Sequence, residues 1–147
     1  MENSFYPFID FLSETNNNIP NNEPLPLYRE IAWDFENDIP LLENNDFKIV
    51  EKNEAIKVWI YHAIKTQRYG YSIYSWDFGA EIENLMGQNY TVEYTKTEVT
   101  RYITEALEIN PYILSIDKIT VEFNDDVLYV YIKITTVYEE LEVNFIV

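Results

Sequence analysis

The sequence predicts an α+β fold in which about three helices cover a mainly antiparallel sheet. Apolar and polar residues alternate over 118–123, 128–135 and 140–145, which is typical of consecutive strands with one buried face. Over about 54–66 and 91–109, apolar residues instead recur three or four positions apart, which predicts amphipathic helices. Helix stripes and sheet faces of this kind bury each other and so form one core.

The composition limits the classes of function that this chain can have. Its 147 residues suffice for one domain, and 26 acidic against 10 basic side chains give a net charge of −16. We therefore expect no binding to nucleic acid, whose phosphates require clustered positive charge, and none to anionic membranes. The chain has no cysteine and one histidine, and its three glycines form no phosphate-binding loop. We expect no cofactor, no bound metal and no catalytic residue.

Residues 1–26 differ in composition from the rest of the chain. They hold four of the six prolines and neither lysine nor arginine, so we expect a flexible segment. An aromatic patch near its start contains Phe5, Tyr6, Phe8 and Phe11. This patch either folds back onto its own domain or docks on a partner protein. The sequence shows no signal peptide, so we expect synthesis in a cytoplasm, with residues 27–147 as the ordered domain.

The ordered pattern begins with two strands and a helix. Ile31, Trp33 and Phe35 alternate with other residues and predict a strand with one apolar face, and residues 47–50 predict a second strand. We expect these N-terminal strands to belong to the sheet together with the C-terminal three-strand meander. Asn53 is the predicted N-cap of the first helix, because its side chain can accept a hydrogen bond from the first turn.

Two further helices are predicted before the meander. A short helix covers about 78–86, between a capping Asp77 and Gly87, which can end a helix in a left-handed conformation. A longer helix begins at Thr91 or four residues later and ends before Pro111, which cannot continue it. The three helices together supply enough apolar surface to cover one face of the sheet.

The middle strand of the meander is predicted to have two different faces. Its inner face is an aliphatic row of Leu128, Val130, Ile132 and Ile134. Its outer face carries Tyr129, Tyr131 and Lys133. The fold does not require two large aromatic residues at successive outward positions, and tyrosine is enriched in protein interfaces. We therefore expect the outer face to contact another protein.

Two features resemble chemical sites only in part. Residues 34–38 carry acids at alternate positions, as in a calcium-binding loop, but Ile39 stands where that loop needs glycine. We therefore interpret this segment as a solvated acidic loop. His62 lies off the apolar stripe of its helix, so we expect a surface or boundary residue rather than a general base.

Residues 64–87 resemble the core of the small baseplate wedge subunits of contractile phage tails. The matching features are an arginine-bearing turn at Arg68, followed by Trp76 and by the triplet Asp77-Phe78-Gly79 that opens a short helix. Residues 27–35 and 53–60 resemble one branch more closely, the XkdS-like baseplate proteins of Firmicute prophages and phage-tail-like bacteriocins. The resemblance covers about residues 25–147. The superfamily is sometimes labelled lysozyme-like, but these residues give no support for bond cleavage.

The chain departs from the resemblance after the long helix. Many subunits of the superfamily have Glu-Pro-Arg at this break, where it seats a helical bundle of neighbouring wedge proteins. Here the matching residues are Asn110, Pro111 and Tyr112, so the backbone break is kept and both charges are lost. The resemblance implies a protein interface at this position, and a partner there cannot use the same ion pairs.

The resemblance implies a structural function. Such subunits connect hub and wedge proteins and initiate assembly of the tail sheath, whose subunits join through added β-strands at an exposed sheet edge. The implied partners are other wedge proteins, the sheath and the hub or tube proteins, with multiple copies in a symmetric baseplate of a virion or tail-like particle. The charge alone suggests one alternative, an acidic inhibitor or nucleic-acid mimic.

Overall fold

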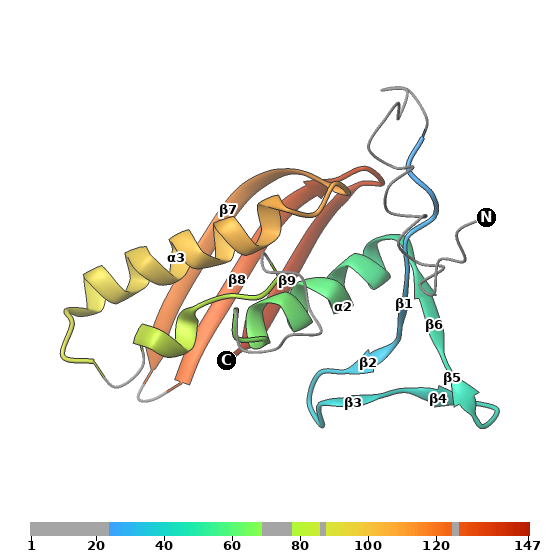
Figure 1. Cartoon of the computed structure of the whole chain (residues 1–147), viewed down its shortest axis with the longest axis horizontal. Helices are drawn as coiled ribbons and strands as arrows, with labels where there is room; N and C mark the ends of the chain where they lie inside the picture. Colours follow the sequence, from blue (N-terminus) through green and yellow to red (C-terminus); the bar gives the residue numbers. More distant parts are fainter. Residues whose placement is uncertain (1–23, 69–77, 86–87, 125–126) are drawn as a thin grey trace, which may run out of the picture.

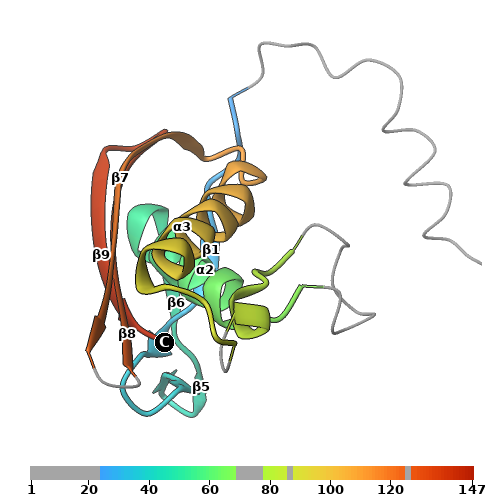
Figure 2. The ribbon, with the colours of Figure 1, turned by 90° about the vertical axis from the view of Figure 1, so that its left-hand side faces the viewer.

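The computed structural model describes residues 24–68, 78–85, 88–124 and 127–147, and a three-stranded antiparallel sheet forms its centre (Figure 1). Both α-helices of the described residues lie on one side of this sheet (Figure 2). The elements in chain order are β1 (Arg29–Ile31), β2 (Trp33–Asp34), β3 (Ile39–Pro40), β4 (Leu42–Glu43), β5 (Asp46–Phe47), β6 (Ile49–Glu51), α2 (Lys52–Lys65), the 3-10 helix η1 (Ile82–Leu85), α3 (Val92–Glu108), β7 (Ile113–Asn124), β8 (Val127–Thr136) and β9 (Glu140–Ile146).

The C-terminal meander has the predicted alternation. The aliphatic row of β8 is almost fully buried, and its partners Val143 and Phe145 on β9 are buried beside it. Strand β7 begins earlier than predicted, at Ile113, and its pairing with β8 has register shifts near both Ile113 and Ile116. Such shifts accommodate an extra residue and bend the strand, so a pattern of strict alternation does not reveal this part of β7.

Helix α3 has the predicted stripe and the earlier of its two predicted starts. The Thr91 side chain accepts a 3.3 Å hydrogen bond from the backbone N–H of Tyr94, which makes Thr91 the N-cap. The buried residues recur at helical spacing and are Val99, Ile103, Ala106 and Leu107. The predicted buried stripe is therefore confirmed.

Helix α2 begins one turn of chain differently from the prediction. Glu51 is its N-cap and Asn53 lies in the first turn, so the prediction that Asn53 is the cap is wrong. The Asn53 side-chain oxygen instead accepts a 2.6 Å hydrogen bond from the Thr136 hydroxyl. The Asn53 amide also lies 3.4 Å from the Glu139 carbonyl oxygen, which it reaches as a donor. This side chain thus joins the start of α2 to the turn between β8 and β9.

The predicted third helix is a single 3-10 turn within the described residues. It spans η1, where Ile82 and Leu85 are buried against the core. Its predicted N-cap Asp77 and its predicted stop Gly87 lie outside the described residues. Two α-helices and one 3-10 helix therefore account for the helical structure that the model describes.

The N-terminal strands form a lobe of their own, Arg29–Glu51, rather than part of the meander. They pair as β1 with β6, β2 with β3 and β4 with β5, all antiparallel. The three pairs meet where Ala32, Leu41 and Lys48 form a closed ring of backbone hydrogen bonds. Ala32 donates to the Lys48 carbonyl at 2.8 Å, Lys48 to that of Leu41 at 3.0 Å, and Leu41 to that of Ala32 at 2.8 Å.

This junction changes which side chains are buried. The expectation that Ile31, Trp33 and Phe35 share one buried face is wrong for Ile31, which is exposed, whereas Ala32 is buried. Trp33 and Phe35 are half-buried and pack against the core. The chain bends at the junction, so the alternation of a single strand does not continue through Ala32.

The lobe contacts helix α2 through Asp38. One carboxylate oxygen of Asp38 accepts a 3.0 Å hydrogen bond from the Trp33 indole N–H and a 2.9 Å bond from the Tyr61 hydroxyl. These bonds hold the pKa of Asp38 below its usual value. The Trp33 ring also packs edge-on against His62 at 4.5 Å, and burial lowers the pKa of His62. His62 is half-buried, which agrees with a boundary residue.

We expect the stability of the domain to fall in two steps as the pH is lowered. Unfolded histidine takes up a proton below about pH 6.5, and folded His62 does so only at lower pH, so protonation favours the unfolded state. The contribution of Asp38 is present above the unfolded value of about 3.9 and is lost as the pH falls through its lower folded pKa. Asp38→Asn should remove the lower step and cost about 1 kcal/mol or less at neutral pH.

Urea unfolding between pH 3 and pH 7 measures this effect. Glu36→Gln is the matched control, because Glu36 is an exposed acid in the same turn. If the control and Asp38→Asn change the pH profile equally, the lobe contact does not contribute the lower step.

Candidate assembly interface

The outer face of the meander is the side of the sheet that the helices do not cover (Figure 2). Tyr129 is 42% exposed there, and its two cross-strand partners are Glu122 on β7 and Ile146 on β9. The next row places Tyr131 between Thr120 and Asn144. Side chains of these two rows line a shallow hollow of about 550 Å³. The predicted tyrosine pair therefore lies at the centre of an open surface with apolar and polar groups.

Charged residues border this hollow at one end. Lys133 lies 3.1 Å from the Glu140 carboxylate and 3.6 Å from that of Glu142. The contact with Glu140 is the main reason why the pKa of Lys133 is raised. The Lys118 ammonium lies 5.9 Å from the centre of the Tyr131 ring. The predicted residues Tyr129, Tyr131 and Lys133 thus form one continuous surface.

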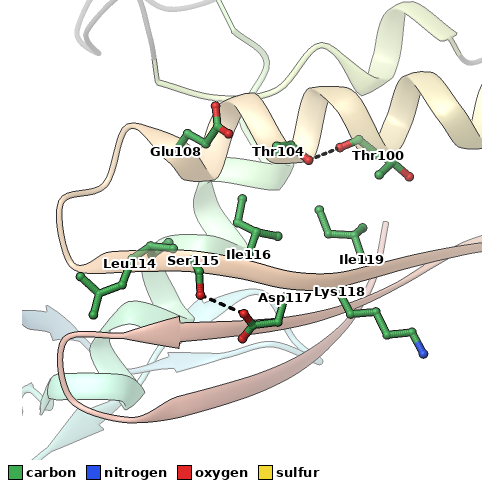
Figure 3. Close-up of a pocket in the computed structure, with 10 residues that line it drawn as sticks. Thr100, Thr104, Glu108, Leu114, Ser115, Ile116, Asp117, Lys118 and Ile119 are labelled. Carbon is green, nitrogen blue, oxygen red and sulfur yellow. Dashed lines mark hydrogen bonds between the residues drawn. The ribbon is translucent and has the colours of Figure 1, made fainter.

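A second hollow, of about 450 Å³, runs between α3 and strand β7 (Figure 3). Ile116 and Ile119 point from β7 toward the helix in this view, whereas Leu114 points away from it. The Thr104 hydroxyl donates to the Thr100 carbonyl at 2.8 Å, and the Ser115 hydroxyl donates to Asp117 at 2.8 Å. Among the described strands, β7 and β9 each pair only with β8, so each has one edge without a strand beside it.

The break after α3 is a hydrogen-bonded turn. The Asn110 carbonyl accepts a 3.0 Å bond from the N–H of Ile113, and the Asn110 side chain accepts a 3.0 Å bond from the N–H of Tyr112. Pro111 occupies the second position of this turn, where its fixed φ is favourable. Asn110 and Tyr112 are buried and Pro111 is exposed. Of the three predicted interface residues, only Pro111 therefore presents its side chain at the surface, and the interface itself stays a prediction.

Tyr112 belongs to a buried cluster with Tyr28 and Tyr138. The Tyr112 ring lies 4.6 Å from Tyr28 and 6.4 Å from Tyr138 between centroids, and burial raises the pKa of Tyr112. The Tyr112 hydroxyl donates a 2.8 Å bond to the Pro26 carbonyl, and the Tyr138 hydroxyl accepts a 3.0 Å bond from the N–H of Tyr28. The sequence analysis did not identify Tyr28 and Tyr138, because no local pattern relates residues 110 positions apart.

A small hollow of about 250 Å³ lies beside the break. Its lining includes Tyr28, Trp59, Phe78, Ile109 and Pro111. The Phe78 ring packs edge-on against Trp59 at 5.9 Å. The structure therefore brings the Asp-Phe-Gly triplet and the proline break, which are distant in sequence, to the same aromatic hollow.

Gly79 and Arg68 fix the chain that leads to this hollow. Gly79 has φ +105°, and a Cβ added there would lie 2.6 Å from the Thr66 carbonyl oxygen. The residue after Gly79 exchanges backbone hydrogen bonds with both strands of this crossing, at 2.9 Å to Thr66 and 3.1 Å from Arg68. The Arg68 guanidinium is mostly buried and lies 3.5 Å from the Glu105 carboxylate on α3. These two motif residues therefore have structural roles.

Several predicted residues and classes of site have a more limited outcome. Trp76 and Asp77 and the aromatic patch of Phe5, Tyr6, Phe8 and Phe11 lie outside the described residues. Within the described ranges, no group of three or more histidine, aspartate or glutamate side chains is placed to hold a metal ion. None of the described helices is long and apolar enough to span a bilayer.

Comparison with known proteins identifies the family. A family model described as "Contractile injection system sheath initiator" matches residues 29–139, which include the lobe, both helices and most of the meander. The chain belongs to this family. The sheath-initiator chain is also 33% identical over 95 residues to "Phage-like element PBSX protein XkdS" of Bacillus subtilis (strain 168), which covers 64% of this chain and 67% of that protein. The resemblance to XkdS-like baseplate proteins is therefore confirmed.

Membership of the sheath-initiator family decides between the two functions that the sequence left open. It identifies the chain as a structural component of a contractile tail or tail-like particle. The alternative of an acidic inhibitor rested on net charge alone and has no support from these relatives.

We expect Gly79→Ala to destabilise the domain. Alanine at φ +105° would be strained, and its Cβ would displace the Thr66 carbonyl, so the cost should be about 1–3 kcal/mol in unfolding free energy. Chemical denaturation measures the loss. Gln88→Ala, at an exposed and irregular position, is the control and should change stability by less than about 0.5 kcal/mol. Equal stabilities of the two variants would contradict the structural role of Gly79.

We expect Tyr112 to act in folding. Tyr112→Phe should cost about 1 kcal/mol through loss of the bond to the Pro26 carbonyl, and Tyr112→Ala about 3 kcal/mol because it also leaves a cavity. Tyr129→Ala is the control at an exposed tyrosine. A Tyr112→Ala variant as stable as this control would show that the buried cluster does not support the fold.

Proposed function

We propose that this sheath initiator is a baseplate wedge subunit that connects hub and wedge proteins and provides the surface on which sheath polymerisation begins. The observation that carries the proposal is the uncovered face of the meander. Tyr129 and Tyr131 are placed at its centre by register, while the core beneath is completed by the opposite side of the same strand. Residues that the fold does not use, and that are costly to expose, favour a contact with another protein.

The two outer strands of the sheet support the sheath-binding part of the proposal. An added strand needs an edge with unpaired backbone groups. Strand β9 pairs with β8 without a register shift, whereas β7 has two shifts and α3 beside it. Shifts of this kind disturb the regular spacing that an added strand needs. We therefore propose β9 as the strand-accepting edge.

The aromatic hollow at the proline break supports a contact with neighbouring wedge proteins. Its lining is mainly apolar, with Trp59, Phe78 and Ile109 beside Pro111. A partner there would bind through apolar contacts rather than through ion pairs. We propose a further contact through the aromatic patch within residues 1–26, several copies in one baseplate, and a structural role without catalysis.

The double variant Tyr129→Ser, Tyr131→Ser tests the outer face. We expect little change in the stability of the purified subunit, about 1 kcal/mol or less for each residue, because the inner core is unaffected. In a strain that lacks the wild-type subunit, the variant should fail to restore contractile tails, which electron microscopy counts directly.

Tyr90→Ser, Tyr94→Ser is the matched control. It makes the same chemical change at two exposed tyrosines whose rings lie 4.9 Å apart near the start of α3. This control should assemble full-length tails. If both double variants restore tails as well as the wild type, the outer face is not an assembly interface. If the outer-face variant does not fold, this face is a second core rather than a surface.

A further inference from the structure

The N-terminal lobe carries apolar side chains that neither the core nor the meander uses. Four of them are large and exposed: Ile31 at 37%, Leu42 at 65%, Phe47 at 51% and Ile49 at 53%. We refer to these four residues as the lobe patch. The lobe extends away from the layer of α3 and the meander (Figure 1). Contiguous apolar surface of this kind is uncommon on a monomer and marks an interaction site.

The strand register places the lobe patch on one side of the lobe. Leu42 lies directly opposite Phe47, and Ile31 lies directly opposite Ile49, so each pair shares a side. Phe47 and Ile49 are two residues apart in an extended stretch, and they point to the same side for that reason. The four side chains thus form one surface rather than scattered apolar positions.

The backbone that carries the lobe patch is held in place without a partner. Asn44 and Asn45 both have positive φ, at 53° and 64°, which forms a tight two-residue turn between β4 and β5. The ring of hydrogen bonds through Ala32, Leu41 and Lys48 fixes the base of the same hairpin. A patch on a preorganised backbone loses little conformational entropy when it binds.

The border of the lobe patch is acidic. The lobe has seven acidic and two basic side chains, and one of the basic ones, Arg29, is paired with Glu51 at 2.9 Å. Glu43 lies directly opposite Asp46, next to the pair of Leu42 and Phe47. Like charges in this position destabilise a hairpin, and a cation from a partner would relieve that cost. A second copy of this chain brings the same acids and a net charge of −16, so it is a poor occupant.

We propose that the lobe patch is a docking surface, separate from the outer face of the meander, for an apolar protein surface bordered by lysine or arginine on another subunit of the tail particle. This inference rests on the proposed function, because the partner is a subunit of the same particle. The apolar pairs would supply the buried contact, and Glu43 and Asp46 would pair with the basic border of the partner.

Thiol labelling in assembled particles tests the proposal, because the full-length chain contains no cysteine of its own. The Leu42→Cys chain and a Val92→Cys control, which is 54% exposed on α3, are each supplied to tail-producing cells that lack the wild-type chain. The free subunits and the purified tails are then treated with a fluorescent maleimide. In tails, L42C should label about tenfold or more slowly than V92C, because a covered thiol reacts only when the contact opens.

Each outcome of the labelling has a defined meaning. If the chain is present in tails and both thiols label at equal rates, fast or slow, the lobe patch is not a docking surface and the proposed function stands. If the chain is absent from tails, the proposed function fails and this inference fails with it.

Two further measurements address the chemistry of the partner. Adding Glu43→Lys to L42C should speed labelling in tails, and an unchanged rate would overturn the basic border of the partner. Sedimentation of the free full-length chain should show a monomer. A dimer that Leu42→Ser abolishes would show that the occupant is a second copy, and would overturn the proposal.

Discussion

Burial of the aliphatic side of β8 is the constraint on which the remaining structure depends. Its row from Leu128 to Ile134 is closed off by residues of α2, α3 and β9, and no comparable layer covers the opposite side among the described elements. Because side chains alternate along a strand, burying one row forces Tyr129 and Tyr131 outward. The surface that is available to partners is therefore a direct consequence of how the core is filled.

The connections to this core are polar and come from distant parts of the chain. Asn53 joins the start of α2 to the β8–β9 turn, Tyr112 joins the α3–β7 turn to the first described residues, and Asp38 joins the lobe to α2. Each connection satisfies a group that would otherwise be costly to bury or would leave a segment without support. A subunit that must present several surfaces to different neighbours needs such connections, because they fix the surfaces relative to one another.

Much of the fold was predictable because the responsible signals are local. The alternation in the meander and the stripe of α3 depend only on the period of a strand or a helix, and the structure confirms both. The Asn110-Pro111 break was predictable for the same reason, since a proline disfavours helix at its own and the preceding position. The outward position of Tyr129 follows from that alternation, and family membership agrees with the motif resemblance.

The sequence by itself thus determined the meander, its two helices and the residues on each side of the sheet. Only the tertiary structure decided that the N-terminal strands form a separate lobe, that Ile31 is exposed and Ala32 buried, and that Asn110 and Tyr112 lie inside the domain. The physical reason is the same in each case. These outcomes depend on hydrogen bonds between segments far apart in sequence, such as Tyr112 to Pro26, and no periodic pattern records such partners.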